Sequence, residues 1–386
     1  MSRVLRLGLT AAAAVIVVGA GTATAQVKVG VAGPITGGSA AFGAQLQKGA
    51  EQAVKDINAA GGLLGQKIDL IIGDDRADPK EGVSVANKFV GDGVKFVIGH
   101  FNSGVTIPSS LVYKDNGIMS ITPASTNPCV TDRKLGPCGD DRKAHPSLLI
   151  FRTCGRDDQQ GTVAGNYIAK SFAGKKIAVI HDKTTYGLGL ANETRKAMAA
   201  KNLKPVMFEG VNKEDKDFSA LVSKIRAARA DLVYWGGLHD TGGLIIRQLR
   251  DQGVKAPLMG GDGIVSDEFS VIGGPGVEGT LMTYGPDPRK RPQAKSIVEK
   301  FRALNFEPEA YTLYSYASLE VLKQAVDSAK SLEPKKVAEK MYSGMKFKTV
   351  IGDLTFDKKG DVTRLDYVMY VWKKDASGKI TYSELQ

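Results

Sequence analysis

Apolar residues occur along most of the chain in short blocks that alternate with longer amphipathic segments. Residues 27–33 and 67–75 read VKVGVAG and KIDLIIGDD, and they have the length and apolar content of buried strands. In the segment between them, Phe42, Leu46 and Ala50 recur at helical spacing and so share one helical face. Strands that alternate with helices predict βαβ units, and therefore parallel sheets covered by helices on both faces.

The alternation runs in two series, which predicts an α/β protein with two lobes, each built on a doubly wound parallel sheet. The second series begins with LIFRTC at residue 149 and ends with APLMGG at residue 256. The remaining elements are too few for a third lobe, so we expect them to be shared between the first two. The chain then crosses between lobes near residues 155, 285 and 351, and such crossings make a hinge. The predicted lobes comprise residues 26–155 with 286–350, and residues 156–285 with 351–386.

The first 25 residues have the pattern of a secretory signal peptide. Arg3 and Arg6 precede an apolar run, and Ala23-Thr24-Ala25 supplies the small residues of a cleavage site. A retained membrane anchor is disfavoured because a spanning helix needs roughly 20 apolar residues and this run is shorter. We therefore expect cleavage after Ala25 and an exported mature protein that is not embedded in the membrane.

Length and charge add little to this picture. The chain of 386 residues is long enough for two domains. Its formal net charge of +11 would suggest nucleic acid in an intracellular protein, but the densest basic run, PRKRP at 288–292, is short and has no interleaved aromatic residue. We interpret the excess of basic residues as a solvated surface and predict no nucleic-acid partner.

Three cysteines follow the predicted signal peptide. An oxidising compartment favours a disulfide, and the segment CVTDRKLGPC would close a small polar loop between Cys129 and Cys138. Cys154 ends an apolar run and is expected to be a buried free thiol. A metal site is the competing interpretation, but the four histidines show no ligand spacing with the cysteines. We predict neither a metal nor a cofactor.

Small polar residues follow two successive predicted strands, in FNSGVT after residue 100 and in PASTNP after residue 122. Ligands of open parallel sheets bind beyond the carboxyl ends of the strands. A helix N-terminus there suits a carboxylate, and freed carbonyls and hydroxyls such as those of Ala124 and Thr126 suit an ammonium group. The pattern favours a small zwitterion. The alternative is that Ser103 and Thr126 simply cap a helix or a turn.

Six ordered segments resemble a known protein family. They are AVKDINAAGGLLGQKI, DDRADPKEGVSVANKFVGDGVKFVIGH, ITPASTNP, VIHDKTTYGLGLA, KDFSALVSKI and MGGDG. The chain resembles the periplasmic leucine/isoleucine/valine-binding proteins, the type I substrate-binding proteins of branched-chain amino-acid ABC transporters. The resemblance covers essentially the whole mature chain. It implies a type I periplasmic-binding-protein fold, a small amino-acid ligand, a membrane permease as partner, a periplasmic location and a monomer.

The resemblance also implies a role for each residue that matches the family's motifs. Ser103 would hold the ligand carboxylate, helped by the backbone N–H of Thr126. The Ala124 carbonyl and the Thr126 hydroxyl would take the ammonium group, and Ser125 belongs to the same ligand-binding cluster. Phe42 would form a wall of the side-chain pocket.

In the second lobe, the resemblance implies that Tyr186 closes over the ligand and that Asp262 completes the ammonium site. Two positions depart from the family pattern. Asp262 is shorter than the acidic residue usual there, often glutamate, and Leu238 stands where an aromatic residue is usual. Besides a branched-chain or related aliphatic L-amino acid, the ligand could therefore be another small carboxylate or amide, such as an aromatic acid. A sensory binding module is likewise an alternative to a transport role.

An enzyme is the remaining alternative. Ser103 follows a strand as a nucleophile would, but the G-x-S-x-G spacing is missing. Gly187 and Gly189 lie between a strand and a helix, but a lone G-x-G without a third glycine is a weak dinucleotide signal. We therefore predict a binding protein with no catalytic residue.

Overall fold

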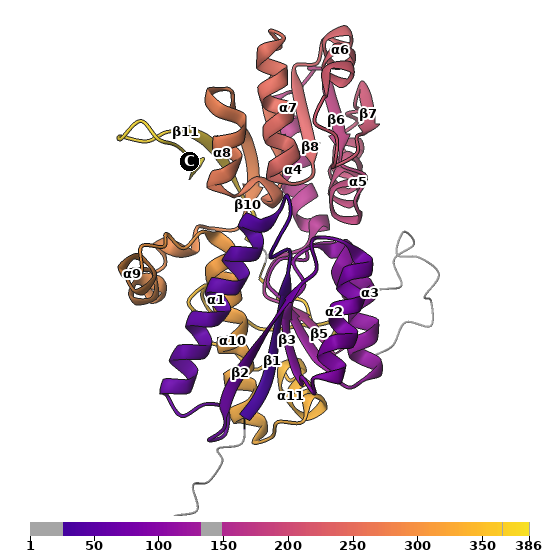
Figure 1. The fold of residues 1–386 in the computed structure, drawn as a ribbon. Coiled ribbons are helices and arrows are strands. Elements are labelled where there is room, and N and C mark those ends of the chain that lie inside the picture. The colour runs from indigo at the N-terminus through magenta and orange to yellow at the C-terminus, as the bar shows by residue number, and fades with distance from the viewer. Residues whose placement is uncertain (1–25, 133–148, 365, 386) are drawn as a thin grey trace, which may run out of the picture.

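The computed structural model describes residues 26–132, 149–364 and 366–385. These residues form two lobes, each built around one β-sheet (Figure 1). No helix among them combines the length and the apolar content that a membrane span requires. The predicted signal peptide lies outside the described residues, so cleavage after Ala25 stays a prediction.

Lobe 1 contains a parallel five-stranded sheet in the order β2-β1-β3-β4-β5. Helices α1 and α10 pack together on one face of this sheet, and α2 and α3 pack together on the other (Figure 1). Every residue of β3 and β4 is buried, as a sheet covered on both faces requires. The strands are β1 (Gln26–Gly33), β2 (Lys67–Asp74), β3 (Phe96–Gly99), β4 (Met119–Thr122) and β5 (Ile150–Arg152). The helices are α1 (Ala40–Ala59), α2 (Pro79–Gly91) and α3 (Ser103–Asp115), joined later in the chain by α9 (Lys295–Ala303), α10 (Ala310–Ala329) and α11 (Pro334–Tyr342).

Lobe 2 contains a seven-stranded sheet in the order β12-β11-β10-β9-β8-β6-β7. Strands β6 to β10 pair in parallel, whereas the C-terminal hairpin β11–β12 adds two antiparallel strands at one edge. The strands are β6 (Ile177–His181), β7 (Met207–Gly210), β8 (Leu232–Gly236), β9 (Leu258–Gly260), β10 (Leu281–Tyr284), β11 (Val368–Lys374) and β12 (Ile380–Glu384). The helices are α4 (Asp157–Ser171), α5 (Thr185–Ala199), α6 (Ser219–Ala228), α7 (His239–Asp251) and α8 (Asp267–Gly273). The predicted α/β architecture of two doubly wound lobes is confirmed, and the antiparallel hairpin is an addition to it.

The segment after α11 stays with lobe 1 for longer than the sequence predicted. Arg152 N in β5 donates a hydrogen bond to Gly360 O at 3.0 Å. In the same segment an antiparallel bridge joins Phe356 to Val362. These contacts favour a third crossing after Val362 rather than near residue 351. The predicted limits of the two lobes otherwise stay predictions.

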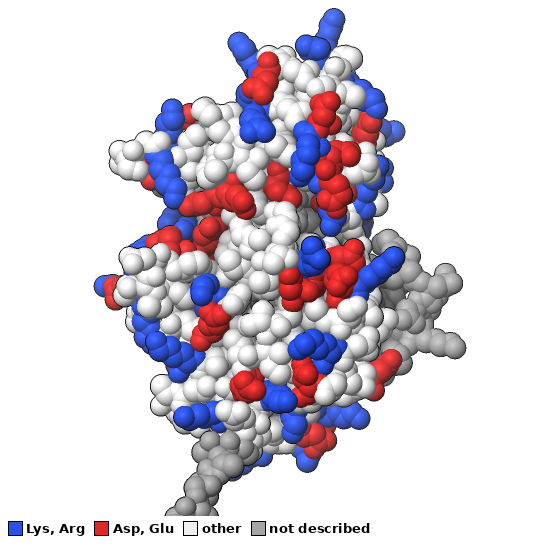
Figure 2. All heavy atoms as spheres, viewed as in Figure 1, with Lys and Arg blue, Asp and Glu red and all other residues white. Residues whose placement is uncertain are grey.

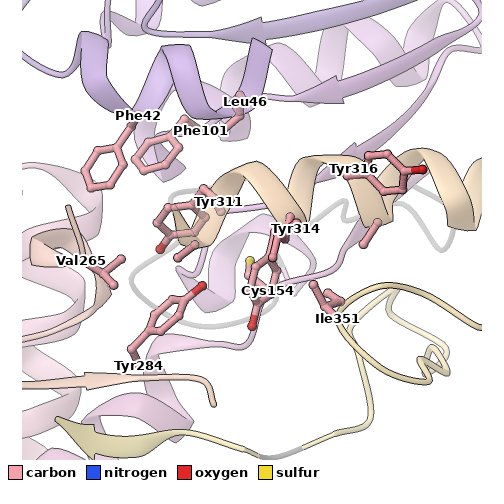
Figure 3. Close-up of a cluster of buried hydrophobic side chains, with 14 of the residues drawn as sticks. Phe42, Leu46, Phe101, Cys154, Val265, Tyr284, Tyr311, Tyr314, Tyr316 and Ile351 are labelled. Carbon is pink, nitrogen blue, oxygen red and sulfur yellow. The ribbon is translucent and has the colours of Figure 1, made fainter. Parts of the chain in front are cut away.

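An aromatic cluster lies where the two lobes meet (Figure 3). Tyr311 on α10 packs edge-on against Phe101 of lobe 1, with ring centroids 5.0 Å apart. On its other side it faces Tyr284 of β10 in lobe 2, at 6.0 Å. Edge-to-face pairs of this kind add about 0.5–1.5 kcal/mol beyond the burial of their area. The junction of the lobes is therefore a packed aromatic core as well as a crossing point of the chain.

Cys154 lies in the same cluster and is a buried free thiol, which confirms the prediction made for it. Burial raises the pKa of this thiol well above its ordinary value, so the group stays protonated and unreactive. Cys138 lies outside the described residues, so its pairing with Cys129 stays a prediction.

The surface carries both signs of charge. Figure 2 shows lysine and arginine side chains interspersed with acidic side chains over the face in view, without one large basic patch. On this face the basic residues are therefore solvated and mixed with acidic ones.

Candidate functional site

Two loops at the carboxyl edge of the lobe 1 sheet meet lobe 2 at a small cavity. Helix α3 begins shortly after β3, and the loop 123–128 follows β4 directly. Lobe 2 contributes the start of α5, the residue before α7 and a short 3₁₀ turn at Asp262–Ile264. The free space between the lining atoms, open solvent included, is about 240 Å³. The lining residues are Phe101, Asn102, Ser103, Ala124, Tyr186, Leu238, Asp262, Gly263 and Tyr311.

Ser103 is the first residue of α3 and is 1% exposed. Its Oγ accepts a hydrogen bond from Asn127 N at 3.2 Å, which joins the start of α3 to the loop after β4. The first N–H groups of a helix have no partner within the helix, and they carry the positive end of its dipole. This corner of the cavity therefore favours an anionic group such as a carboxylate.

The loop after β4 is held from beneath by the buried guanidinium of Arg152. Its Nη1 donates to Ser125 O at 2.9 Å and to Asn127 O at 3.0 Å, and its Nε lies 2.7 Å from Asp361 Oδ1. The Ser125 hydroxyl also faces away from the cavity and donates to Phe101 O at 2.9 Å. The backbone that follows Ala124 is thus fixed, and Ala124 itself lines the cavity.

Asp262 gives the opposite side of the cavity a fully buried carboxylate. Tyr186 Oη donates to its Oδ1 at 2.8 Å and Gln160 Nε2 to the same oxygen at 3.0 Å, while Tyr311 Oη donates to Oδ2 at 2.8 Å. Burial raises the pKa of Asp262, and these three hydrogen bonds act in the opposite direction by stabilising the charged form. A cation placed in the cavity would find an anion already oriented by neutral donors.

A second buried carboxyl group stands behind the first. Asp157 is the first residue of α4 and is fully buried. Gln160 Nε2 lies 3.5 Å from Asp157 Oδ1 and 3.0 Å from Asp262 Oδ1, so it bridges the two acids. Burial first, and then the charge of Asp262, raises the pKa of Asp157 well above its ordinary value. Asp157 therefore favours its neutral form, and the negative charge on this side of the cavity is that of Asp262.

The structure brings five of the predicted site residues together and leaves three behind the wall. Those that line the cavity are Ser103, Ala124, Tyr186, Leu238 and Asp262. Ser125, Thr126 and Phe42 are fully buried and do not line it. Phe42 stacks on Phe101 at 4.5 Å between ring centroids, so Phe101 presents the aromatic surface that the sequence assigned to Phe42. The ligand-binding roles of all eight residues stay predictions.

Comparison with known proteins places this architecture in a family. Residues 26–379 match the family model described as periplasmic binding protein. The chain belongs to the periplasmic binding protein family. It is 57% identical over 372 residues to the Leu/Ile/Val-binding protein homolog 1 of Brucella suis biovar 1 (strain 1330), which covers 96% of this chain and 97% of that relative.

Two solved structures of amino-acid-binding proteins have similar folds. The leucine-binding protein LivK of Thermotoga maritima is 28% identical with a TM-score of 0.82, covering 92% of this chain and 97% of that one. The substrate-binding protein LivJ of Streptococcus pneumoniae, solved with isoleucine, is 25% identical with a TM-score of 0.80, covering 93% and 100%. The family resemblance identified from the sequence is confirmed.

Sequence reasoning missed several residues around the cavity of this periplasmic binding protein. Phe101 directly precedes the polar cluster at Asn102 and Ser103, so the same strand-end argument could have included it. Tyr311 lies near the start of α10, where residues 310–319 are all buried, and no local pattern marks it as a cavity residue. Asp157 follows a predicted strand within RTCGRDD, and its acidic pair with residue 158 was the available signal.

Proposed function

We propose that this protein is the extracytoplasmic ligand-binding component of an ABC importer, which captures branched-chain or related aliphatic L-amino acids and delivers them to a membrane permease. The observation that carries the proposal is a cavity with opposite polarity at its two sides. The N-terminus of α3 and Ser103 lie on one side, and the buried carboxylate of Asp262 lies on the other. The names of the Brucella relative and of the two solved proteins support this ligand class.

Each end of a zwitterionic head group has a matching partner. The ligand carboxylate would accept hydrogen bonds from Ser103 and from the N–H groups that begin α3. The ammonium group would donate to the Ala124 carbonyl and to Asp262. The apolar part of the ligand would pack against Phe101 and Leu238, which line the same cavity. Burial of both charges is tolerable because each is hydrogen-bonded.

Capture would occur by closure of the two lobes and would involve no chemical step. In the structure the lobes already touch through hydrogen bonds from Asn127 Nδ2 to Thr185 O at 2.8 Å and from Tyr311 Oη to Asp262 at 2.8 Å. A ligand that binds groups of both lobes adds further contacts available only in the closed form. It therefore shifts the population toward that form.

The proposal includes an exported, periplasmic, monomeric protein whose signal peptide is removed after Ala25. Two cavity residues differ from those usual in the resembled family, and they favour a second ligand class for the same binding function. Asp262 is shorter than the acidic residue of the resembled family, and Leu238 lacks an aromatic ring, so a small carboxylate or amide without an ammonium group is the alternative ligand. A sensory binding module, which would use the same site, is the alternative to transport.

Calorimetry on the mature protein, unfolded and refolded to remove any carried-over ligand, tests the proposal. Leucine, isoleucine and valine should bind. The deaminated acid 4-methylpentanoate should bind about 30-fold or more weakly than leucine, because it leaves the buried Asp262 carboxylate without its cation, at a cost of about 2–3 kcal/mol. Binding of the deaminated acid with no response to any amino acid would overturn the ligand class.

A matched pair of serine variants on α3 tests the site itself. Ser103→Ala should weaken leucine binding by about tenfold, since it removes one hydrogen bond to a charged group. Ser109→Ala removes a fully buried hydroxyl that has no hydrogen-bond partner among the described residues and that does not line the cavity. It should leave affinity unchanged. Equal affinity of both variants would remove Ser103 from the site.

A further inference from the structure

A second and larger cavity adjoins the ligand cavity. It lies between the starts of α2 and α3 in lobe 1 and the starts of α5 and α7 in lobe 2, where Figure 1 shows α3 and α5 facing each other across the waist. Its free space, open solvent included, is about 790 Å³. This outer cavity shares Asn102, Tyr186 and Leu238 with the ligand cavity. The two spaces therefore meet along these three side chains.

Two lysines line the outer cavity, and both ammonium groups are already engaged. Lys183 Nζ donates to Asn212 Oδ1 at 3.0 Å. Lys213 Nζ donates to Ala77 O of lobe 1 at 3.2 Å and lies 3.6 Å from Glu214 Oε1. Among the described residues neither lysine forms an ion pair with Asp182 or Asp240, but both keep their positive charge. Burial raises the pKa of Asp182, and the charge of Lys213 opposes that rise.

Two carboxylates line the same cavity, and each has one oxygen without a donor among the described residues. Asp182 is 4% exposed, and Thr184 donates to its Oδ1 from both N and Oγ1, at 2.9 and 2.6 Å. Asp240 Oδ1 accepts from Thr241 N at 2.8 Å. The second oxygen of each carboxylate therefore retains its full capacity to accept a hydrogen bond from a cation in the cavity.

The boundary between the two cavities carries both apolar and polar groups. Leu238 offers an aliphatic surface there, and the Oδ1 atom of Asn102 is buried at the same boundary without a hydrogen-bond partner among the described residues. Asp182 and Asp240 line the outer cavity but not the ligand cavity. A ligand side chain that combines an aliphatic stem, N–H donors and a delocalised cation matches these three kinds of group, and arginine has all of them.

Among the described residues, the side of the ligand cavity near Asp262 offers a more obstructed exit. A third cavity there shares Asp262 and Tyr311 with it, but these two residues are hydrogen-bonded to each other at 2.8 Å. Passage in that direction would break a hydrogen bond to a buried carboxylate, whereas the aliphatic side chain of Leu238 makes no hydrogen bond that passage could break. The outer cavity is therefore the direction in which a longer ligand can extend.

We propose that the ligand site continues past Leu238 into the outer cavity and binds L-amino acids with an elongated cationic side chain, with arginine as the best fit, alongside aliphatic ones. This rests on the proposed function, because the α-amino-acid head would be held by the same groups. Asp182 and Asp240 would bind the distal cation and act as specificity residues for this ligand class alone.

Calorimetry with leucine, arginine and citrulline on the refolded mature protein tests this extension. Citrulline has nearly the shape of arginine but no charge. Arginine should bind within about tenfold of leucine and about tenfold or more tightly than citrulline. Asp182→Asn and Asp240→Asn should each weaken arginine by about tenfold and leave leucine unchanged. Asp251→Asn, which removes an equal charge from the exposed end of α7, is the matched control and should change neither.

One further variant tests the passage. Leu238→Tyr should fill the boundary between the cavities and weaken arginine binding by a larger factor than it weakens leucine binding; an equal loss for both ligands would count against the passage. If the unsubstituted protein binds leucine but not arginine, the extension is wrong and the proposed function stands. If neither binds, both fail. If arginine binds but the two asparagine variants bind it as well as the parent does, the outer cavity is not its site and the inference is overturned.

Discussion

Removal of the Arg152 guanidinium should destabilise lobe 1 more than any surface charge change. The group is fully buried and supports the loop beneath Ala124 through Ser125 O and Asn127 O, at 2.9 and 3.0 Å. It also pairs with Asp361 at 2.7 Å. Arg152→Met keeps most of the aliphatic stem and deletes the donors.

The expected magnitude follows from what is left without a partner. Removing one member of a buried ion pair costs about 3–5 kcal/mol. Asp361 keeps a second cation, because Arg156 Nη1 lies 2.8 Å from its Oδ2, so the carboxylate itself is not left alone. The two loop carbonyls lose their donor. We therefore expect a loss near the low end of that range, about 3 kcal/mol in the free energy of unfolding.

Urea unfolding followed by far-ultraviolet circular dichroism measures this loss. Both tryptophans of the chain, Trp235 in β8 and Trp372 in β11, lie in lobe 2, so tryptophan fluorescence follows that lobe separately. The fluorescence transition should move less than the dichroism transition. Arg302→Met, which breaks an ion pair whose arginine is 56% exposed, is the control and should cost less than about 1 kcal/mol. A loss for Arg152→Met no larger than that of the control would refute the reasoning.

Three further predictions follow from single contacts. Tyr311→Phe removes the hydroxyl that joins α10 to the cavity carboxylate at 2.8 Å and should weaken leucine binding about tenfold in calorimetry; unchanged affinity would contradict this. Burial raises the pKa of Asp182 to about 6. The folded state then binds the proton more tightly than the unfolded state. As the pH rises from about 4 to about 6, the free energy of unfolding should therefore fall by up to about 3 kcal/mol. Asp182→Asn should remove that fall in urea titrations across this range, and parallel pH profiles for both proteins would count against it. Native Cys154 should not react with a thiol reagent, and in denaturant without reductant one thiol per chain should react; three would disprove the Cys129–Cys138 disulfide.

The fold was predictable because its signals are local. The period of the apolar residues differs between a strand such as β1 and a helix such as α1, and the order of the elements then fixes a doubly wound sheet. The antiparallel hairpin at the C-terminus was less accessible. Val368 to Lys374 reads as a strand in either direction, and its partner β10 lies far earlier in the chain. Likewise, nothing local in the segment near Gly360 reveals that it contacts β5 of lobe 1.

The position of the site was predictable because strand ends are also a local signal. The residues that reach the site only through tertiary packing were not predictable. Ser103 and Ala124 stand at strand ends, where the topology alone predicts a ligand. Tyr311 is the second residue of α10. It reaches the cavity only because α10 packs on α1 in lobe 1 and begins at the lobe junction. The sequence analysis placed Phe42 at the cavity, whereas Phe42 lies behind Phe101. A sequence does not show which of two stacked rings faces a cavity.

The polar residues at the strand ends divide between two tasks that the sequence presents as alternatives. The Thr122 hydroxyl donates to the carbonyl of His100 at 2.6 Å, and the hydroxyl oxygens of Thr106 and Ser125 lie 3.2 and 3.1 Å from the same carbonyl oxygen and 2.5 Å from each other. None of the three residues lines the cavity. They are structural residues, although the sequence suggested such a role for Ser103 and Thr126 instead. Because they hold the end of β3 in place, however, the neighbouring Ser103 can face the cavity with a fixed geometry. A binding site that discriminates head groups by buried hydrogen bonds needs such a fixed frame, because a displacement of the order of 1 Å is enough to weaken them.

The density of small polar residues after β3 and β4 is thus explained by the support of the site as much as by contact with a ligand. Variants of the supporting hydroxyls should therefore lower affinity through the frame rather than through a lost ligand contact.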